Sequence, residues 1–396
     1  MNISVYTLTS ELHDEQAVSA VTKEFLNSLK IKLDFKGADY ADYGSHTLDL
    51  IYVRTGGTEG IFRKLLPTLL KQSVKPFYLL TSGKSNSLAA SMEILSFLRQ
   101  NGLSGEIIHG SPEYISGRIG LLARTGKAKE MLRDCRLGII GKPSDWLISS
   151  EADKDMVRQK LGIELVSVPM EELLEVLKNT PLEVVEEGTA PTPEIQKALP
   201  GAEQIYHALK TLVKKYKLQG FTLRCFDLLT AVHNTGCLAL ARLNAEGIIA
   251  GCEGDVPAML SMKIAQALTG VGGFQANPAR IAPETGEILM AHCTIPLNMV
   301  ERYELDTHFE SGIGVGIRGY MKEGPVTLFK VSGDLSRHFI AEGELIRNQS
   351  EPDLCRTQQV IRLSDARQTH YFLTDPIGNH HIVLPGHHRE LLENFL

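Results

Sequence analysis

Two segments far apart in the chain combine residue types that bind divalent metal ions. Residues 247–255 (GIIAGCEGD) form a short apolar run that ends at a glycine-flanked carboxylate, Glu253. Residues 377–383 place His380 and His381 beside a second apolar run. Carboxylate oxygens and imidazole nitrogens from distant segments are ligands that suit a divalent cation in an enzyme site. The sequence therefore predicts a metal centre built from these two segments.

Each of these side chains also has a structural explanation. A carboxylate directly after an apolar run is costly to bury alone, so a capping or ion-paired Glu253 explains the pattern equally well. Asp255 precedes Val256 and Pro257, where it is expected to cap the helix that follows. Neighbouring residues of a strand point to opposite faces, so only one of His380 and His381 is expected to face Glu253.

Two further polar residues are candidates for the same site. His292 follows the apolar run 289–291 and would line the pocket, although a single histidine in such a place is more often a hydrogen-bonded core residue. Arg54 opens the glycine-rich loop 54–60 ahead of a predicted helix, where an anion could bind. A tight turn between strand and helix explains that loop as well.

The order of predicted elements divides the chain into three parts. Residues 1–130 alternate strand and helix signals, which is typical of parallel βαβ units. The same cycle restarts at 137–141, so a second α/β domain is expected over residues 131–290, with Glu253 in it. Residues 291–396 contain short apolar runs separated by Gly, Pro and Asp, which indicate antiparallel strands. The predicted fold is two Rossmann-like α/β domains followed by a β-rich, barrel-like C-terminal domain.

The composition narrows the class of protein. The chain has 396 residues, 43% of them hydrophobic and 22% charged, as in soluble globular proteins. Its 41 basic and 47 acidic residues give a net charge of −6, which argues against nucleic acid as a partner. No apolar run approaches the roughly 20 residues of a membrane span, and residues 1–30 lack a signal-peptide pattern. The six cysteines are scattered, so we expect reduced thiols and a cytoplasmic location.

From about residue 237 to the C-terminus, the chain resembles the L-fucose isomerase and L-arabinose isomerase superfamily. The resemblance rests on an ordered set of segments: GCEGD at 251–255, AHCT at 291–294, GIGVG at 312–316 and GNHH at 378–381. It implies aldose–ketose isomerisation of a small sugar through an ene-diol intermediate. It also implies a divalent metal, usually manganese with magnesium or cobalt as alternatives, and a homo-oligomer such as a trimer or hexamer.

The resemblance also assigns roles to residues of this chain. Glu253 takes the place of the first ligand carboxylate, where it also takes part in catalysis, and His381 that of the ligand histidine. His292 falls where the arabinose enzymes have another histidine, and His292, His380, Asp255 and Arg54 are the candidates for substrate contact.

One position departs from the family pattern. Asn277 stands where the second metal carboxylate is expected. We take it as a candidate ligand and site residue, since an amide oxygen binds hard cations but cannot act as an acid or base. The departure leaves two other functions open: a non-catalytic sugar-binding homologue, or a lyase or epimerase that uses the same metal enediolate.

Overall fold

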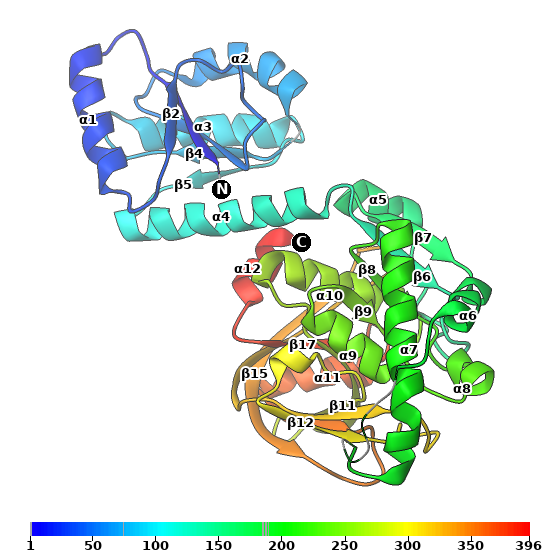
Figure 1. Cartoon of the computed structure of the whole chain (residues 1–396). Helices are drawn as coiled ribbons and strands as arrows, with labels where there is room; N and C mark the ends of the chain where they lie inside the picture. Colours follow the sequence, from blue (N-terminus) through cyan, green and yellow to red (C-terminus); the bar gives the residue numbers. More distant parts are fainter. Residues whose placement is uncertain (1, 74, 184–185, 187, 189) are drawn as a thin grey trace. The chain divides into compact units, whose positions relative to one another are not determined.

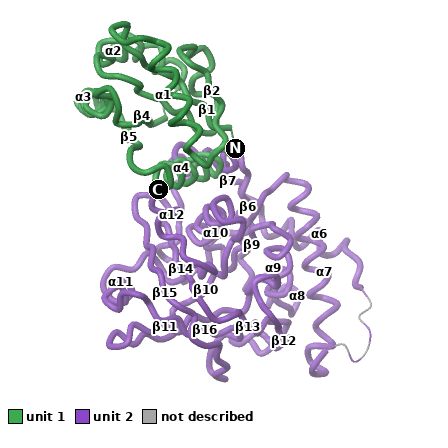
Figure 2. The backbone as a smooth tube through the Cα atoms, turned by 90° about the vertical axis from the view of Figure 1, so that its left-hand side faces the viewer, with its two compact units in different colours: residues 1–130 green, residues 131–396 purple. Residues whose placement is uncertain are grey.

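The computed structural model describes residues 2–73, 75–183, 186, 188 and 190–396. The chain divides into two compact units, Met1–Glu130 and Met131–Leu396 (Figure 2). Within the described residues, every helix is too short or too polar to cross a membrane.

The first unit is a five-stranded parallel sheet in the order β2-β1-β3-β4-β5, with a helix after each strand except β2 (Figure 1). Strands β1 and β3 are buried at every position, as expected for the centre of a sheet covered on both faces. The strands are β1 (Ile3–Leu8), β2 (Asp34–Gly37), β3 (Leu48–Val53), β4 (Phe77–Leu80) and β5 (Gly105–Ile108). The helices are α1 (Glu15–Ser28), α2 (Glu59–Gln72), α3 (Ser87–Gln100) and α4 (Pro112–Leu132).

The second unit begins with a four-stranded parallel sheet in the order β7-β6-β8-β9. Its strands are β6 (Arg136–Ile140), β7 (Glu164–Val168), β8 (Gly220–Leu223) and β9 (Ile249–Gly251). The helices of this part are α5 (Lys154–Leu161), α6 (Met170–Asn179), α7 (Pro193–Tyr216), α8 (Asp227–Val232), α9 (Cys237–Ala245) and α10 (Val256–Thr269).

The rest of the second unit is a closed antiparallel barrel in the order β10-β11-β16-β15-β14-β17. Its strands are β10 (Phe274–Ala282), β11 (Glu287–His292), β14 (Gly324–Val331), β15 (His338–Gln349), β16 (Thr357–Leu363) and β17 (His381–Pro385). Strands β12 (Arg302–Asp306) and β13 (Gly316–Tyr320) form a separate hairpin, and the short helices are η1 (Leu297–Met299), η2 (Ala366–Gln368), α11 (Thr369–Thr374) and α12 (Arg389–Phe395). The two parallel sheets and the barrel confirm the predicted fold class.

Strand β10 differs from the sequence-based expectation. It starts the barrel at Phe274, so residue 291, where the β-rich domain was expected to begin, lies inside β11. Pro278 hides this strand in the sequence, because proline cannot donate to a sheet and is rare inside strands. The structure accommodates it at a register shift between Pro278 and Arg280.

Helix α10 joins the four-stranded sheet to the barrel. It packs against β8 and β9 on one side and against β14 and β17 on the other. Ten of its residues are buried, which explains why its sequence is apolar on nearly every face rather than along one stripe. The loop that leads into this helix carries Glu253, so the packing of α10 fixes where that carboxylate lies.

Candidate metal centre

Glu253 lies in a tight turn between β9 and α10. The turn has left-handed backbone at Glu253 (φ 61°) and Gly254 (φ 73°), a conformation that costs a non-glycine residue about 1 kcal/mol or more. Two hydrogen bonds hold it: Gly254 N donates to Leu223 O (2.9 Å) and Ser144 N donates to Glu253 O (2.9 Å). The turn therefore fixes the glutamate backbone at the carboxyl end of the parallel sheet.

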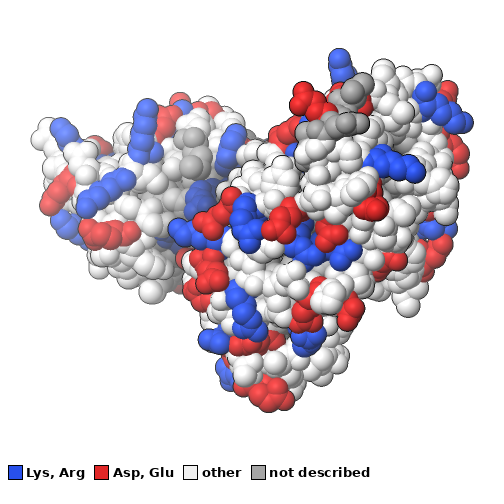
Figure 3. Space-filling view, turned by 60° about the horizontal axis from the view of Figure 1, so that its bottom comes forward, with Lys and Arg blue, Asp and Glu red and all other residues white. Residues whose placement is uncertain are grey.

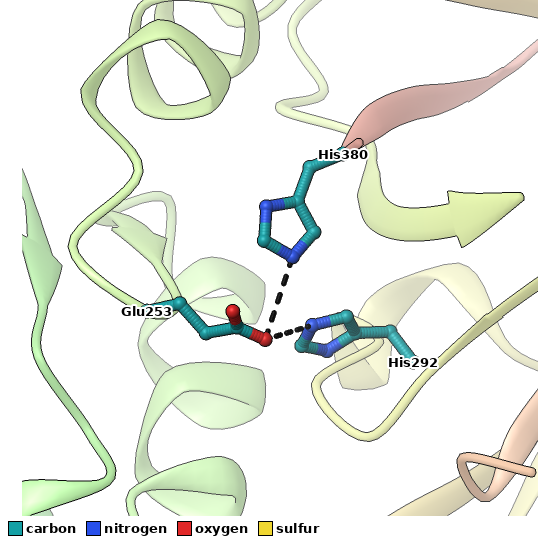
Figure 4. Close-up of side chains that lie close together, drawn as sticks. All are labelled: Glu253, His292 and His380. Carbon is teal, nitrogen blue, oxygen red and sulfur yellow. Dashed lines mark ion pairs between the residues drawn. The ribbon is translucent and has the colours of Figure 1, made fainter. Parts of the chain in front are cut away.

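Three side chains from different parts of the fold meet at this turn (Figure 4). Glu253 Oε1 lies 3.5 Å from Nε2 of His292, at the end of β11, and 3.5 Å from Nε2 of His380, just before β17. The three ligand atoms lie within 4.8 Å of one another, so this group has the spacing to hold a metal ion. All three residues are buried.

The charges of the group are strongly coupled. Burial by itself raises the pKa of Glu253, but the charge of His380 and the close contacts with both imidazoles hold that pKa well below its usual range. Burial by itself lowers the pKa of His380, but the charge of Glu253 and the hydrogen bond with Asp255 raise it to about 9. Glu253 is thus ionised at neutral pH, and His380 carries a proton whenever no cation neutralises the carboxylates.

Asp255 orients His380 from the opposite side of the ring. Its Oδ2 lies 2.9 Å from His380 Nδ1, and since an ionised carboxylate only accepts hydrogen bonds, Nδ1 carries the proton. Nε2 then points to Glu253, as in the carboxylate–histidine pairs that support metal sites. Asp255 also accepts from Ala258 N (2.7 Å), so it caps α10 as expected.

A buried lysine completes this arrangement. Lys330 Nζ lies 3.4 Å from Asp255 Oδ2, and both side chains are almost fully buried. Burial by itself raises the pKa of Asp255, but the charge of Lys330 and the hydrogen bond with His380 lower it to about 2.

The structure places His381 away from the carboxylates, so the expectation that it lies with Glu253 is corrected: His380 has that position. His381 Nδ1 contacts the carbonyl oxygen of Asn379 (3.0 Å) and its Nε2 contacts Tyr371 Oη (3.0 Å). His381 is paired with Ala276 of β10, which lies in the apolar core, and alternation along the strand turns His380 to the other face. Burial lowers the pKa of His381 to about 3, so the ring is neutral.

Asn277 lies beside the same group. It follows Ala276 and therefore faces His380 across β10 and β17, and it lines a pocket together with Glu253. Its side-chain oxygen and His380 Nε2 are both buried, and neither has a hydrogen-bond partner among the described residues. Buried polar atoms without partners are rare in native proteins. A divalent cation bound by Asn277, Glu253 and the two imidazoles would give the Asn277 oxygen and His380 Nε2 a partner. These residues therefore fit such an ion.

The pocket next to the group has a volume of about 370 Å³. Its lining residues are Trp146, Phe226, Glu253, Asn277, Glu310 and Asn379. Trp146 Nε1 donates to Glu253 Oε2 (2.7 Å), and the indole packs edge-on against Phe226 at 4.7 Å between ring centroids.

Sequence reasoning missed Trp146, Phe226 and Glu310. They lie in loops or at a helix start, where no hydrophobic periodicity marks a functional residue. One signal was available for Trp146: it is the chain's single tryptophan and follows the predicted strand 137–141, and the strands of a parallel sheet end at one edge.

Arg54 belongs to the first unit. Its buried guanidinium donates to hydroxyl oxygens of Thr9, Thr22 and Ser19 and to Glu15 Oε1, at 2.8–3.1 Å. It lines a cavity of about 820 Å³ at the carboxyl ends of β1, β2 and β3. Its hydrogen bonds hold the first helix against the sheet, and its role as a substrate contact stays a prediction.

No known family model matches the chain. It is similar to the sulfoquinovose isomerase of Alkalicoccus urumqiensis, with 21% identity over 261 residues, 62% of this chain and 59% of that protein. It is similar to the sulfoquinovose isomerase of Clostridium sp. (strain MSTE9), with 26% identity over 238 residues, 56% of this chain and 51% of that protein. The sulfoquinovose isomerase of Priestia megaterium is 21% identical over 265 residues, 62% of this chain and 59% of that protein. The match thus spans between half and three-fifths of these relatives' length.

Proposed function

We propose that this chain is a metal-dependent aldose–ketose isomerase that works through an ene-diol intermediate. The observation that carries the proposal is the buried group of Glu253, His292 and His380 beside a 370 Å³ pocket. Pockets of this size suit small molecules. The similarity to sulfoquinovose isomerases supports a sugar as substrate and isomerisation as the reaction.

We assign the metal to Glu253, His292, His380 and the side-chain oxygen of Asn277. A hard divalent cation such as Mn²⁺ accepts this mixture of oxygen and nitrogen ligands, with Mg²⁺ and Co²⁺ as alternatives. When bound, the cation would polarise the sugar carbonyl and acidify the neighbouring hydroxyl group.

The protein's own residues prepare this chemistry. Asp255 keeps the proton of His380 on Nδ1, which leaves Nε2 free to act as a ligand. Trp146 holds Glu253 Oε2 in place and lines the entrance to the carboxylate with its half-exposed ring. The pair of Trp146 and Phe226 forms an apolar wall on which the carbon-bound hydrogens of a sugar ring would pack.

The experiment is a conversion assay with Mn²⁺ on sulfoquinovose, L-fucose and L-arabinose, followed by NMR. We expect the wild-type protein to interconvert at least one aldose with its ketose and Glu253→Gln to lose the metal and turnover together. His207→Ala is the matched control, because His207 forms a second potential metal-binding group among the described residues, with Glu183 and Glu203, at a solvent-accessible place. Binding of these sugars without conversion would favour a non-catalytic sugar-binding protein, and a different product would favour a lyase or epimerase.

We further propose a homo-oligomer, a trimer or hexamer, in the cytoplasm. The resemblance to the fucose and arabinose isomerases supports the assembly, and the six free cysteines fit a reducing compartment. Sedimentation equilibrium of the wild-type protein tests the assembly, and a monomer at micromolar concentration would contradict it.

A further inference from the structure

An aldose–ketose isomerase that works through an ene-diol needs a group to take a proton from one sugar carbon and deliver it to the next. Glu253 is poorly placed to do this alone. Its Oε2 accepts the Trp146 indole N–H, and its Oε1 lies between the imidazoles of His292 and His380. Asn277, where the family resemblance implies a second carboxylate, cannot ionise.

The pocket contains one further carboxylate, from a part of the chain that the resemblance does not mark. Glu310 lines the pocket together with Glu253 and Asn277. Among the residues that the structure describes, no hydrogen bond or ion pair joins the Glu310 side chain to another group. Glu310 is exposed, so its carboxylate is available to contact a ligand in the pocket.

The loop that carries Glu310 is held firmly between β12 and β13. His308 N donates to Ile313 O (3.1 Å) and Gly312 N donates to His308 O (2.9 Å), which closes a compact turn around Glu310. The His308 ring packs edge-on against Phe226 at 5.5 Å, and Arg356 Nε donates to Thr307 O (2.7 Å). These contacts fix the backbone on both sides of the glutamate.

The two carboxylates of the pocket differ in their surroundings. Glu253 lies between the imidazoles of His292 and His380, whereas Glu310 lines the pocket. Partial burial raises the pKa of Glu310. Proton transfer is most efficient for a group whose pKa lies nearer the working pH.

We propose that Glu310 is the catalytic acid–base of this site and replaces the carboxylate that is absent at Asn277. This inference rests on the proposed isomerase function. In the forward direction, the Glu310 carboxylate takes the proton from C2 of the open-chain aldose, and the C2–H electron pair forms the C1=C2 double bond while the C1=O1 bond opens and O1 takes a proton from water. Glu310 then returns its proton to C1, O2 gives its hydroxyl proton to water, and the C2=O bond of the ketose forms.

The test compares Glu310→Gln with Glu301→Gln, a matched control at an exposed residue just before β12. Turnover of sulfoquinovose, L-fucose and L-arabinose with Mn²⁺ is measured by NMR, together with deuterium uptake from heavy water. Loss of an acid–base group typically lowers turnover about 10²–10⁴-fold, and we expect this for Glu310→Gln only. Glu310→Asp, which keeps the carboxylate, should retain part of the activity.

A readout independent of turnover separates catalysis from binding. Trp146 is the only tryptophan of the chain and lines the pocket, so its fluorescence reports ligand binding there directly. We expect Glu310→Gln to bind Mn²⁺ and each of the three sugars as the wild type does, because Glu310 is not one of the assigned ligands. Unchanged Mn²⁺ binding also shows that the variant is folded.

A chemical test on the wild-type protein does not depend on the folding of a variant. Carbodiimide with glycine ethyl ester should modify Glu310, which peptide mapping identifies, and sugar in the pocket should protect it. Modification of Glu310 without loss of turnover, or full turnover by Glu310→Gln, would overturn the inference and leave the proposed function intact. Absence of conversion by the wild-type protein would instead reject the proposed function, and this inference with it.

Discussion

His380 and His381 are adjacent in the chain, yet their side chains have opposite surroundings. His380 lies between two carboxylates, whereas His381 is buried among Tyr371, Phe339 and Phe372. Strand alternation predicts that only one of them can face Glu253. The sequence does not tell which one, because that depends on which face of β17 the closed barrel turns toward its core.

The two histidines should therefore respond differently to substitution. We expect His380→Ala to weaken Mn²⁺ binding by at least about 10²-fold, the upper part of the range known for changes that support a metal site. His381→Ala should leave the Mn²⁺ affinity nearly unchanged but lower the free energy of unfolding, because it removes a buried ring and its hydrogen bond. Isothermal titration with Mn²⁺ and thermal unfolding measure the two effects. The reverse order of Mn²⁺ affinities would show that His381 is the ligand.

The raised pKa of His380 makes Mn²⁺ binding depend on pH. Its value of about 9 means that a cation must displace a proton from Nε2 at any lower pH. The apparent affinity should rise about tenfold per pH unit toward pH 9 and level off above it.

The same shift has the opposite consequence for stability without metal. A folded-state pKa above the unfolded value stabilises the metal-free protein below the unfolded pKa, and this stabilisation is lost as the pH rises through about 9. Titrations with Mn²⁺ between pH 6 and 9, in buffers of matched ionic strength, test the predicted rise in affinity. A Mn²⁺ affinity that does not change with pH would contradict the protonation assigned to His380.

At the scale of elements, Asp255 links three parts of the second unit: it caps α10, holds Lys330 of β14 and orients the histidine that precedes β17. Asp255→Asn removes the charge but keeps a side chain able to cap the helix. Since it leaves Lys330 buried without a counter-charge, we expect a loss of about 3–5 kcal/mol in the free energy of unfolding, measured by urea denaturation.

A double-mutant cycle with Lys330→Met separates the pair from the cap. The double variant should lose less than the sum of the two single losses, because neither charge is then left alone. Additive losses would show that the two charges do not stabilise each other.

The elements themselves were largely predictable from the sequence, and the site was predictable in part. Residues 1–130 were expected to form parallel βαβ units and do so, because apolar runs bounded by turns identify buried strands such as β1 and β3. The cap at Asp255 follows from its place before Val256 and Pro257. Glu310 could not be predicted, since its loop carries no periodic signal and its meeting with Trp146 depends on long-range packing.

At the scale of the whole molecule, the net charge of the chain is −6. Acidic and basic side chains lie next to one another on the face shown in Figure 3. Ion pairs such as Arg280–Glu351 and Arg362–Glu287 connect neighbouring segments of the barrel region. Ion pairs as exposed as these contribute little to the free energy of unfolding. We therefore expect the main contributions to come from the cores of the two units and from metal binding.

Mn²⁺ should stabilise one unit and not the other. The assigned ligands Glu253, Asn277, His292 and His380 all belong to Met131–Leu396, whereas Met1–Glu130 has its own apolar core. A ligand that binds only the folded state adds about 2.7 kcal/mol at a free concentration of roughly 100 times its Kd. Differential scanning calorimetry should therefore show one transition that moves to higher temperature with Mn²⁺ and one that does not move.

The Glu253→Gln variant identifies the transition that responds. It should show both transitions at positions independent of Mn²⁺, because the ion has lost its carboxylate ligand while the first unit is untouched. Arg54→Met serves as the converse control: it removes the hydrogen bonds that hold α1 to the first sheet, and so should lower the other transition alone. If Mn²⁺ raised both transitions equally in the wild-type protein, the two units would unfold together, and metal binding would stabilise the chain as a single cooperative structure.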